Sequence, residues 1–314
     1  MPEDEQKILI SGASGLLGTA LCRALALRRQ PVTQLVRSTP LPSVEERKTL
    51  LWDPAAHPAF VDPEGLEDAA AAIHLSGASV GAQRWTEKYR REMVESRVAS
   101  TRALAESLAG LRKKPKALLV ASAVGYYGSR AAELLDESSA PGSGFLAELC
   151  QQWEQASEPA RLAGIRVAHL RLGVILAPRG GALQKMLPAF RLGLGGPLGS
   201  GHQWMSWISL EDAVRGFLFV LDRPDLEGAI NLTAPQAATN AEFARALGRQ
   251  LHRPTFFRAP APVLRLALGQ MADETLLAST RAVPSKLLAS GFTFLQSTLE
   301  STLQAALHPT NFTR

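Results

Sequence analysis

The most restrictive feature of the sequence is a glycine motif between a short apolar run and an amphipathic segment. The run Lys7-Ile-Leu-Ile10 leads into Gly12-Ala-Ser-Gly15-Leu-Leu-Gly18, and apolar residues then recur at helical spacing as far as Leu25. Residues 31–36 form a second strand-like run, which completes a β-α-β unit. Glycines at this spacing permit a tight turn and bring backbone N–H groups close to a pyrophosphate. The motif therefore predicts dinucleotide binding rather than a purely structural turn.

The same alternation continues through the first half of the chain. Strand-like runs cover residues 70–75 and 116–121, with a helical pattern over 86–108 between them. Residues 145–163 then read as a helix and 166–176 as a buried strand. Such an order of elements predicts an α/β fold built on a doubly wound, parallel Rossmann-type sheet.

The character of the sequence changes at Pro178. Glycines crowd residues 192–201, and two capping-box patterns, Thr239-x-x-Glu242 and Ser297-x-x-Glu300, each open a helical run. We therefore expect a smaller, mainly helical substrate lobe at the C-terminal side. The predicted division is an NADP-binding domain at 1–177, to which 208–233 return, and a substrate lobe at 178–207 and 234–314.

The end of the second predicted strand indicates which dinucleotide is bound. An acidic residue there accepts from a ribose 2′-hydroxyl, whereas an arginine pairs with a 2′-phosphate. Arg37 holds this position, Ser38 follows it, and no Asp or Glu lies between Pro31 and Val44. NADP is therefore favoured over NAD, the alternative being an exposed arginine without a ligand.

Composition narrows the range of partners. The net charge of +5 is dispersed except at Arg112, Lys113, Lys114 and Lys116, which we interpret as a solvated helix end rather than a nucleic-acid patch. Residues 1–6 are too acidic for a signal peptide, and no apolar run approaches the ~18 residues that cross a bilayer. Cys22 and Cys150 lie far apart, so no disulfide or metal site is expected. We expect a cytoplasmic protein with a small-molecule substrate, no nucleic-acid or membrane partner and an open oligomeric state.

Beyond these features, the chain resembles the extended and atypical short-chain dehydrogenases/reductases, and more closely the NAD-dependent epimerase/dehydratase-like branch with its own C-terminal helical domain. The resemblance covers nearly the whole chain. The matching segments are 10–18, 74–78, Ser96-Arg97 with Thr101, 122–128, 136–137, 171–175, 193–203, 207–212, 284–288 and 291–294.

This resemblance implies a seven-stranded parallel sheet with the cofactor across its carboxyl edge. Leu75 and Ser76 would flank the adenosine and pyrophosphate, and Arg97 would reach the cofactor with Glu92 nearby. A surface ion pair between Glu92 and Arg97 is the alternative. Together with Arg37 and Ser38, the candidate cofactor residues are Gly12, Ser14, Gly15, Leu16, Leu17, Gly18, Leu75, Ser76, Gly77, Glu92, Arg97, Ser122, Arg171 and Ile175.

The sequence departs from the superfamily at its catalytic signature. The resemblance implies a serine and a YxxxK pair, in which the lysine lowers the pKa of the tyrosine, but aligning on Glu154 places Leu146 and Cys150 at these two positions. The substitute catalytic candidates are Ser122, Tyr126 and Tyr127 at the end of a predicted strand. Both tyrosines could instead simply pack.

Other polar residues are weaker candidates: Glu137 in a loop, Lys185, His202, Gln203 and Trp204 in or beside the glycine-rich segment, and His74 and His169 on predicted strands, where structural roles are expected. Two functional hypotheses follow. The first is an NADP(H)-dependent oxidoreductase or epimerase-like protein acting on a small hydroxyl or carbonyl compound. The second is a catalytically degenerate NADP-binding regulator or scaffold, which the missing YxxxK favours.

Overall fold

The core of the protein is a seven-stranded parallel sheet in the order β11-β7-β5-β4-β1-β2-β3. The computed structural model describes residues 6–38, 48–56, 58–60 and 62–308. The acidic N-terminal segment and most of the stretch between Arg37 and Val44 lie outside this described part. The strands are β1 (Lys7–Ser11), β2 (Val32–Val36), β3 (Lys48–Leu51), β4 (Ala69–His74), β5 (Ala117–Ala123), β7 (Arg166–Leu172) and β11 (Gly228–Leu232).

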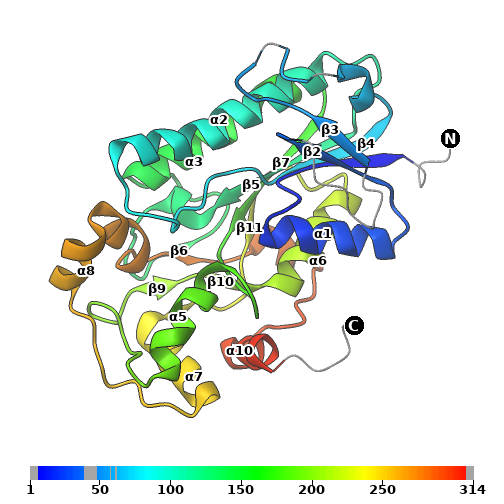
Figure 1. Ribbon diagram of the computed structural model, residues 1–314. Coiled ribbons are helices and arrows are strands. Elements are labelled where there is room, and N and C mark those ends of the chain that lie inside the picture. The colour runs from blue at the N-terminus through cyan, green and yellow to red at the C-terminus, as the bar shows by residue number, and fades with distance from the viewer. Residues whose placement is uncertain (1–5, 39–47, 57, 61, 309–314) are drawn as a thin grey trace.

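Helices cover both faces of this sheet, as the β-α-β alternation predicts (Figure 1). One face carries α1 (Leu16–Leu27) and α6 (Leu210–Asp222), and the other carries α2 (Glu87–Ala109), α3 (Phe145–Gln155) and α4 (Glu158–Leu162). The central strands β1, β4 and β5 are mostly apolar because both faces of the sheet are buried there. The predicted doubly wound Rossmann-type sheet is confirmed.

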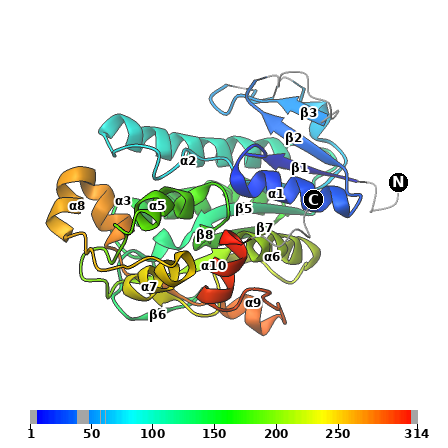
Figure 2. The ribbon, with the colours of Figure 1, turned by 60° about the horizontal axis from the view of Figure 1, so that its bottom comes forward.

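A second, smaller core joins the C-terminal lobe to the end of the sheet. It consists of side chains from α5 (Gly181–Arg191), α7 (Asn240–Leu251) and α10 (Leu299–Leu307), which Figure 2 shows grouped together. Short strands, helices and helical turns make up the rest of the structure. These are η2 (Pro63–Leu66), η3 (Val124–Tyr127), β6 (Leu134–Leu135), β8 (Val174–Leu176), β9 (Trp204–Met205), β10 (Trp207–Ser209), β12 (Ala238–Thr239), α8 (Ala261–Leu268), η4 (Ala272–Leu276), β13 (Arg281–Ala282) and α9 (Ser285–Ala289).

Two predicted elements are each divided in the structure. The helix expected over 145–163 ends at Gln155, because Pro159 in the first turn of α4 has no N–H to donate to the Gln155 carbonyl. The strand expected over 166–176 breaks at Gly173, after which β8 leaves the main sheet and pairs with β10. A Cβ at Gly173 would lie 2.9 Å from the Ser206 carbonyl oxygen, so this close backbone approach requires glycine.

The starts of α7 and α10 can be compared with the capping boxes predicted from the sequence. Thr239 and Glu242 form the predicted capping box at the start of α7. The prediction of a capping box at Ser297 is wrong by one residue, because the Thr298 hydroxyl accepts from the Ser301 N–H at the start of α10. The cap position is decided by which backbone N–H groups the hydroxyl reaches.

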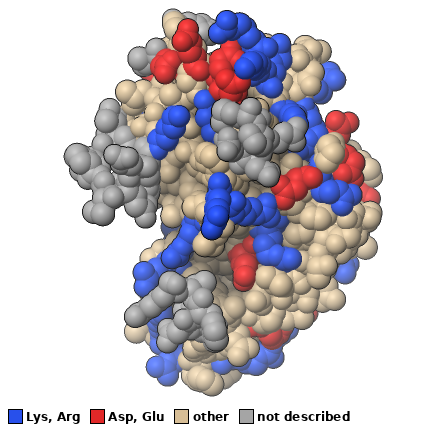
Figure 3. Space-filling view, turned by 90° about the vertical axis from the view of Figure 1, so that its right-hand side faces the viewer, with Lys and Arg blue, Asp and Glu red and all other residues tan. Residues whose placement is uncertain are grey.

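Surface charge is mixed on the side of the protein seen in Figure 3, where acidic side chains lie among basic ones. The basic run after α2 follows the same pattern. The Glu67 carboxylate accepts from the N–H groups of Arg112 and Lys113, and Lys113 pairs with Asp68 at 2.9 Å. This run is an exposed connection whose charges are partly compensated, in agreement with its interpretation as a solvated helix end.

Candidate functional site

The glycine loop between β1 and α1 has the geometry of a dinucleotide turn. Gly12 has a φ of +68°, and a Cβ on it would lie 2.8 Å from the Leu75 backbone carbon. A Cβ on Gly18 would lie 2.2 Å from the Gly12 carbonyl oxygen, so α1 can pack on the loop only without a side chain there. The Gly15 N–H donates to the Gly12 oxygen at 3.0 Å and closes the turn.

The N-terminus of α1 is left open to an anion. Its N-cap residue, Gly15, offers no side-chain acceptor, and the first turn contains no acidic residue. The N–H groups of this turn are therefore without the usual cap, and the helix dipole adds positive potential. Ser14 and Gly15 are exposed at this point, whereas Leu17 and Gly18 are buried and serve the packing of the loop.

The neighbouring strand ends contribute a cation and a rigid support. Arg37 and Ser38 follow β2 and are both exposed. After β4, the buried His74 ring hydrogen-bonds Ser11 at 2.6 Å and Ser100 at 3.0 Å, and the Ser11 hydroxyl accepts from the Leu75 N–H. Burial lowers the pKa of His74 to about 3, so the ring is neutral and structural, as the sequence predicts. This network fixes the backbone that leads into Ser76.

Arg97 lies directly behind the loop that follows β4. A Cβ on Gly77 would lie 3.0 Å from its guanidinium carbon, and the guanidinium donates to the Ala78 carbonyl at 2.8 Å. The opposite side of the guanidinium contacts the Trp153 ring, 5.0 Å from its centroid. Burial lowers the pKa of Arg97, and no described acid forms an ion pair with it. Glu92 is exposed, whereas Arg97 is buried. The alternative, a surface ion pair between these two residues, does not form.

The segment that follows β8 lies beside the start of α1. Ile175 is half-buried in β8, and Gly180 and Gly181 lie next to the Leu16 side chain. The Lys185 ammonium on α5 donates to the Gly81 carbonyl in the loop before α2. Residues that follow β8 thus meet the loops after β1 and β4 at the carboxyl ends of these strands, where open α/β sheets bind ligands.

Leu146 and Cys150, at the two positions where the resemblance implies a catalytic tyrosine and lysine, lie in apolar surroundings. A Cβ on Gly125, in the turn after β5, would lie 3.5 Å from the Leu146 Cβ and 3.9 Å from the Cys150 sulfur. Burial raises the pKa of the Cys150 thiol to about 12, so it stays protonated and inert. Neither residue can move a proton as a Tyr–Lys pair would.

A buried polar network lies beside this apolar corner. Glu154 accepts from Arg171 through both carboxylate oxygens, at 2.8 Å each, and from the Ser122 hydroxyl at 2.7 Å. Arg171 also donates to the Tyr127 hydroxyl at 3.0 Å. The side-chain donors of Ser122 and Arg171 are therefore already used within the protein. Their roles as catalytic and cofactor side chains stay predictions, and the structure shows both side chains bound to Glu154 at the ends of β5 and β7.

The two tyrosines after β5 differ in accessibility. Tyr127 is fully buried, its hydroxyl lies 2.7 Å from the Asn231 Oδ1 that accepts from it, and burial raises its pKa. The hydroxyl is enclosed by protein, so the predicted catalytic role would require Tyr127 to give up its contact with Asn231. Tyr126 is half-buried, and its ring face lies 3.4 Å from the Arg171 guanidinium carbon. Tyr126 is the catalytic candidate that the geometry leaves.

Comparison with known proteins agrees with this geometry. Residues 8–232 match the NAD dependent epimerase/dehydratase family, and residues 259–306 match a domain of unknown function, DUF1731. The chain belongs to the NAD dependent epimerase/dehydratase family. Its relatives include epimerase family protein Mb2239 of Mycobacterium bovis, 43% identical over 94% of this chain and 96% of the relative. The human epimerase family protein SDR39U1 is 36% identical over 92% of this chain and 95% of its own length.

Solved structures of the family show the same architecture. The crystal structure of human SDR39U1 (isoform 2) with NADPH has a TM-score of 0.86 and 32% identity, covering 97% of this chain and all of that chain. A nucleoside-diphosphate sugar epimerase from Corynebacterium glutamicum has a TM-score of 0.77 and 32% identity, over 97% of this chain and 59% of that one. The resemblance to the epimerase/dehydratase branch is thereby confirmed.

Most of the weaker candidates in this epimerase-family chain form hydrogen bonds or stacking contacts within the protein. Glu137 accepts from the N–H groups of Asn231 and Lys286 and so ties β11 to α9. Gln203 is buried and donates to the carbonyls of Leu198 and Leu276. Trp204 contacts the Arg281 guanidinium, 4.1 Å from the ring centroid, and His202 is exposed. His169 hydrogen-bonds Ser157 at 2.8 Å.

Two important residues were missed by the sequence reasoning. The Glu274 carboxylate accepts from the N–H groups of Phe145 and Leu146 and caps α3 from the C-terminal lobe. Asn231 holds the Tyr127 hydroxyl from the edge strand of the sheet. A polar residue within the apolar run of β11 was the signal that could have identified Asn231.

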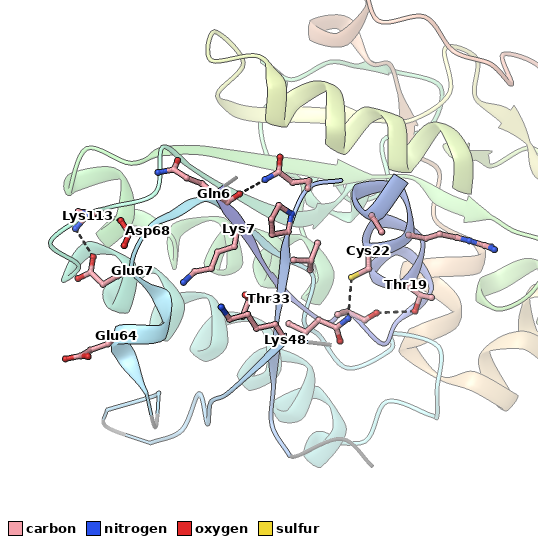
Figure 4. Close-up of a pocket in the computed structure, with 17 residues that line it drawn as sticks. Gln6, Lys7, Thr19, Cys22, Thr33, Lys48, Glu64, Glu67, Asp68 and Lys113 are labelled. Atoms are coloured by element: carbon pink, nitrogen blue, oxygen red, sulfur yellow. Dashed lines mark hydrogen bonds and ion pairs between the residues drawn. The ribbon is translucent and has the colours of Figure 1, made fainter. Parts of the chain in front are cut away.

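A large cavity opens at the amino ends of the strands, and Ala13 and Thr19 of the glycine loop and α1 are among the residues that line it. It occupies about 1300 Å³ along α1 and around the amino ends of the strands, where Figure 4 shows Lys7, Thr33, Lys48 and Asp68. None of the candidate cofactor or catalytic residues lines it. We place the candidate site at the carboxyl edge because the glycine turn, the uncapped helix and the cations converge there.

Metal-ligand clusters and membrane-spanning helices are both absent among the described residues. They contain no group of three or more His, Cys, Asp or Glu side chains that could hold a metal ion. Among the same residues, no helix is long and apolar enough to span a bilayer.

Proposed function

We propose that this protein binds NADP(H) across the carboxyl edge of its sheet and catalyses hydride transfer to or from a small hydroxyl or carbonyl compound. The observation that carries the proposal is the uncapped N-terminus of α1 behind a glycine turn that a Cβ at Gly12 or Gly18 would destroy. The NADPH named with the human SDR39U1 structure supports the same assignment.

The preference for NADP over NAD rests on Arg37. Its exposed guanidinium at the end of β2 would pair with the 2′-phosphate, and Ser38 could add a hydroxyl contact. The pyrophosphate would lie at the first turn of α1, close to Ser14 and Gly15. Leu75, Ser76 and Gly77 would line the cofactor on one side, with the positive charge of Arg97 behind them.

NADPH bound here would supply a hydride to the carbonyl carbon of a substrate. The proposed protein partner in that step is Tyr126, whose hydroxyl would donate a proton to the carbonyl oxygen. The Arg171 guanidinium against the ring face puts a fixed positive charge where negative charge would develop on the tyrosine. Glu154 holds that guanidinium in place.

A second function, that of a non-catalytic NADP-binding regulator or scaffold, is favoured by one observation. Leu146 and Cys150 fill the usual relay positions and pack on Gly125. Such a protein would use the cofactor to stabilise a conformation rather than to react. Its behaviour would depend on Gly15 and Arg37 but not on Tyr126.

Cofactor binding is tested first, by titrating the protein with NADPH and NADH and following nicotinamide fluorescence. We expect tighter binding of NADPH, and we expect the two affinities to converge in Arg37→Ala but not in Arg102→Ala, an exposed arginine on α2. Equal affinities in the unmodified protein would overturn the NADP assignment. If Gly15→Val binds both nucleotides as tightly as the unmodified protein, the assignment of the glycine loop as the binding site is overturned.

Catalysis is tested by NADPH consumption against a panel of aldehydes and ketones. Tyr126→Phe keeps the ring on Arg171 and removes only the hydroxyl, so we expect a loss of kcat of about 100-fold or more with unchanged NADPH affinity. Turnover that survives in Tyr126→Phe would exclude this tyrosine. Binding of NADPH with no turnover on any substrate class would favour the regulator.

A further inference from the structure

Six large apolar side chains stand exposed on adjoining segments of the C-terminal lobe. They are half of the twelve such side chains among the described residues: Leu192, Leu194, Phe256, Phe257, Val263 and Leu266. Phe256 is 86% exposed, Leu266 80% and Leu192 74%. A concentration of exposed apolar area of this kind marks a surface that another structure covers.

The segments that carry these side chains lie side by side. The Arg253 guanidinium donates to the Arg191 carbonyl at 2.8 Å, and residues Leu198 and Ala259 form a backbone bridge. Figure 1 shows the connection from α7 following the outer edge of the lobe up to α8, a helix without a buried residue. We call this surface, defined by the six apolar residues with Arg191, Arg253 and Arg258, the outer face.

Basic residues outnumber acidic ones in the segments that carry the outer face. Residues 186–210 and 243–272 contain no Asp or Glu, and they carry six basic residues: Arg191, Arg245, Arg249, Arg253, Arg258 and Arg265. Two of these form ion pairs, Arg249 with Glu300 on α10 and Arg265 with Asp273, which directly follows the second range. Figure 3 shows the other side of the protein, where acidic side chains lie among the basic ones.

We propose that the outer face docks on an anionic phospholipid surface. Phe and Leu side chains would enter the boundary between headgroups and acyl chains, while the arginines that form no ion pair with a described residue would meet the lipid phosphates. A second copy of this chain is a poorer occupant, because two such faces would bring like charges together. The sequence-based expectation of no membrane partner rested on the lack of a spanning run, and a surface contact needs none.

The test is flotation of the full-length protein with vesicles of phosphatidylcholine alone and with phosphatidylserine added. We expect the protein to float with the anionic vesicles only and to be released as salt is raised. Replacing both aromatic side chains, Phe256→Ser with Phe257→Ser, should reduce the bound fraction by about tenfold or more, because the inserted apolar area is lost. Arg258→Glu should reduce it as well.

Matched control variants distinguish binding through the outer face from non-specific binding to vesicles. Leu27→Ser removes a side chain that is 83% exposed at the end of α1, and Lys114→Glu reverses an exposed charge after α2. Both controls should bind vesicles as the unmodified protein does, and all variants should keep its NADPH affinity and circular dichroism. The proposal is overturned by equal binding to neutral vesicles, by undiminished binding of the double variant, or by a dimer that the double variant abolishes without any lipid binding.

Discussion

Glu154 and Arg171 form a two-point ion pair, with both nitrogen–oxygen distances at 2.8 Å, at the junction of α3 and β7. Their side chains are 11% and 4% exposed, so neither charge is solvated by bulk water. The pair supports Ser122 and Tyr127 through further hydrogen bonds, and the stacked ring of Tyr126 rests on the guanidinium. One ion pair thus orders the carboxyl ends of two neighbouring strands.

Glu154→Gln should lower the free energy of unfolding by about 3–5 kcal/mol, because it leaves the Arg171 charge buried without a counter-ion. Urea denaturation measures this change. The control is Glu158→Gln, which breaks an exposed pair with Arg161 and should cost less than about 1 kcal/mol. Losses of similar size in the two variants would contradict the structural importance of the buried pair.

Gly18→Ala should destabilise the protein by about 1–3 kcal/mol and weaken NADPH binding, because the added Cβ would lie 2.2 Å from the Gly12 carbonyl oxygen. At Gly15 the added Cβ would lie 3.3 Å from the same atom, so Gly15→Ala should have the smaller effect on unfolding. Thermal unfolding with and without NADPH distinguishes the two. A larger stability loss in Gly15→Ala would show that the packing of the loop is not as described.

The pH dependence of stability should carry the signature of His74. Burial lowers its folded pKa to about 3 from the ordinary value of 6.5, so the unfolded chain binds the extra proton between these values. The contribution to stability is complete above pH 6.5 and is lost as pH falls, by about 2 kcal/mol at pH 5. His74→Gln should flatten the dependence of the unfolding free energy on pH between 7 and 5. An unchanged dependence in His74→Gln would contradict a neutral, buried ring at this position.

The parts of the fold that were predicted from sequence are those governed by neighbours in the chain. The glycine turn, α1 and the start of α7 each depend on residues within one or two turns, and the structure has them where the patterns place them. Gly173 shows the limit of this reasoning. Its break in the strand is imposed by the backbone of Ser206, a partner that no local pattern reveals.

In the candidate site, too, some features follow from the local sequence and others depend on residues far away in the chain. The exposed cation at Arg37 follows from its place at a strand end, whereas the burial of Tyr127 depends on Asn231, which is 104 residues away in the chain. The Glu274 cap on α3 joins positions 128 residues apart. Long-range polar contacts of this kind decide which candidate side chains remain accessible, and the separate segments do not encode them individually.

Arg97→Met should separate cofactor binding from folding. The guanidinium is a buried charge without a described counter-ion, so its removal relieves a desolvation cost that offsets the loss of its hydrogen bonds to Ala78 and Met93. We expect the free energy of unfolding to change by less than about 1 kcal/mol. NADPH affinity should fall about tenfold, because the positive charge behind Gly77 is lost from the cofactor cleft. Arg102→Met, on the exposed side of α2, should change neither quantity. A variant that loses several kcal/mol of stability yet binds NADPH normally when folded would restrict Arg97 to a structural role.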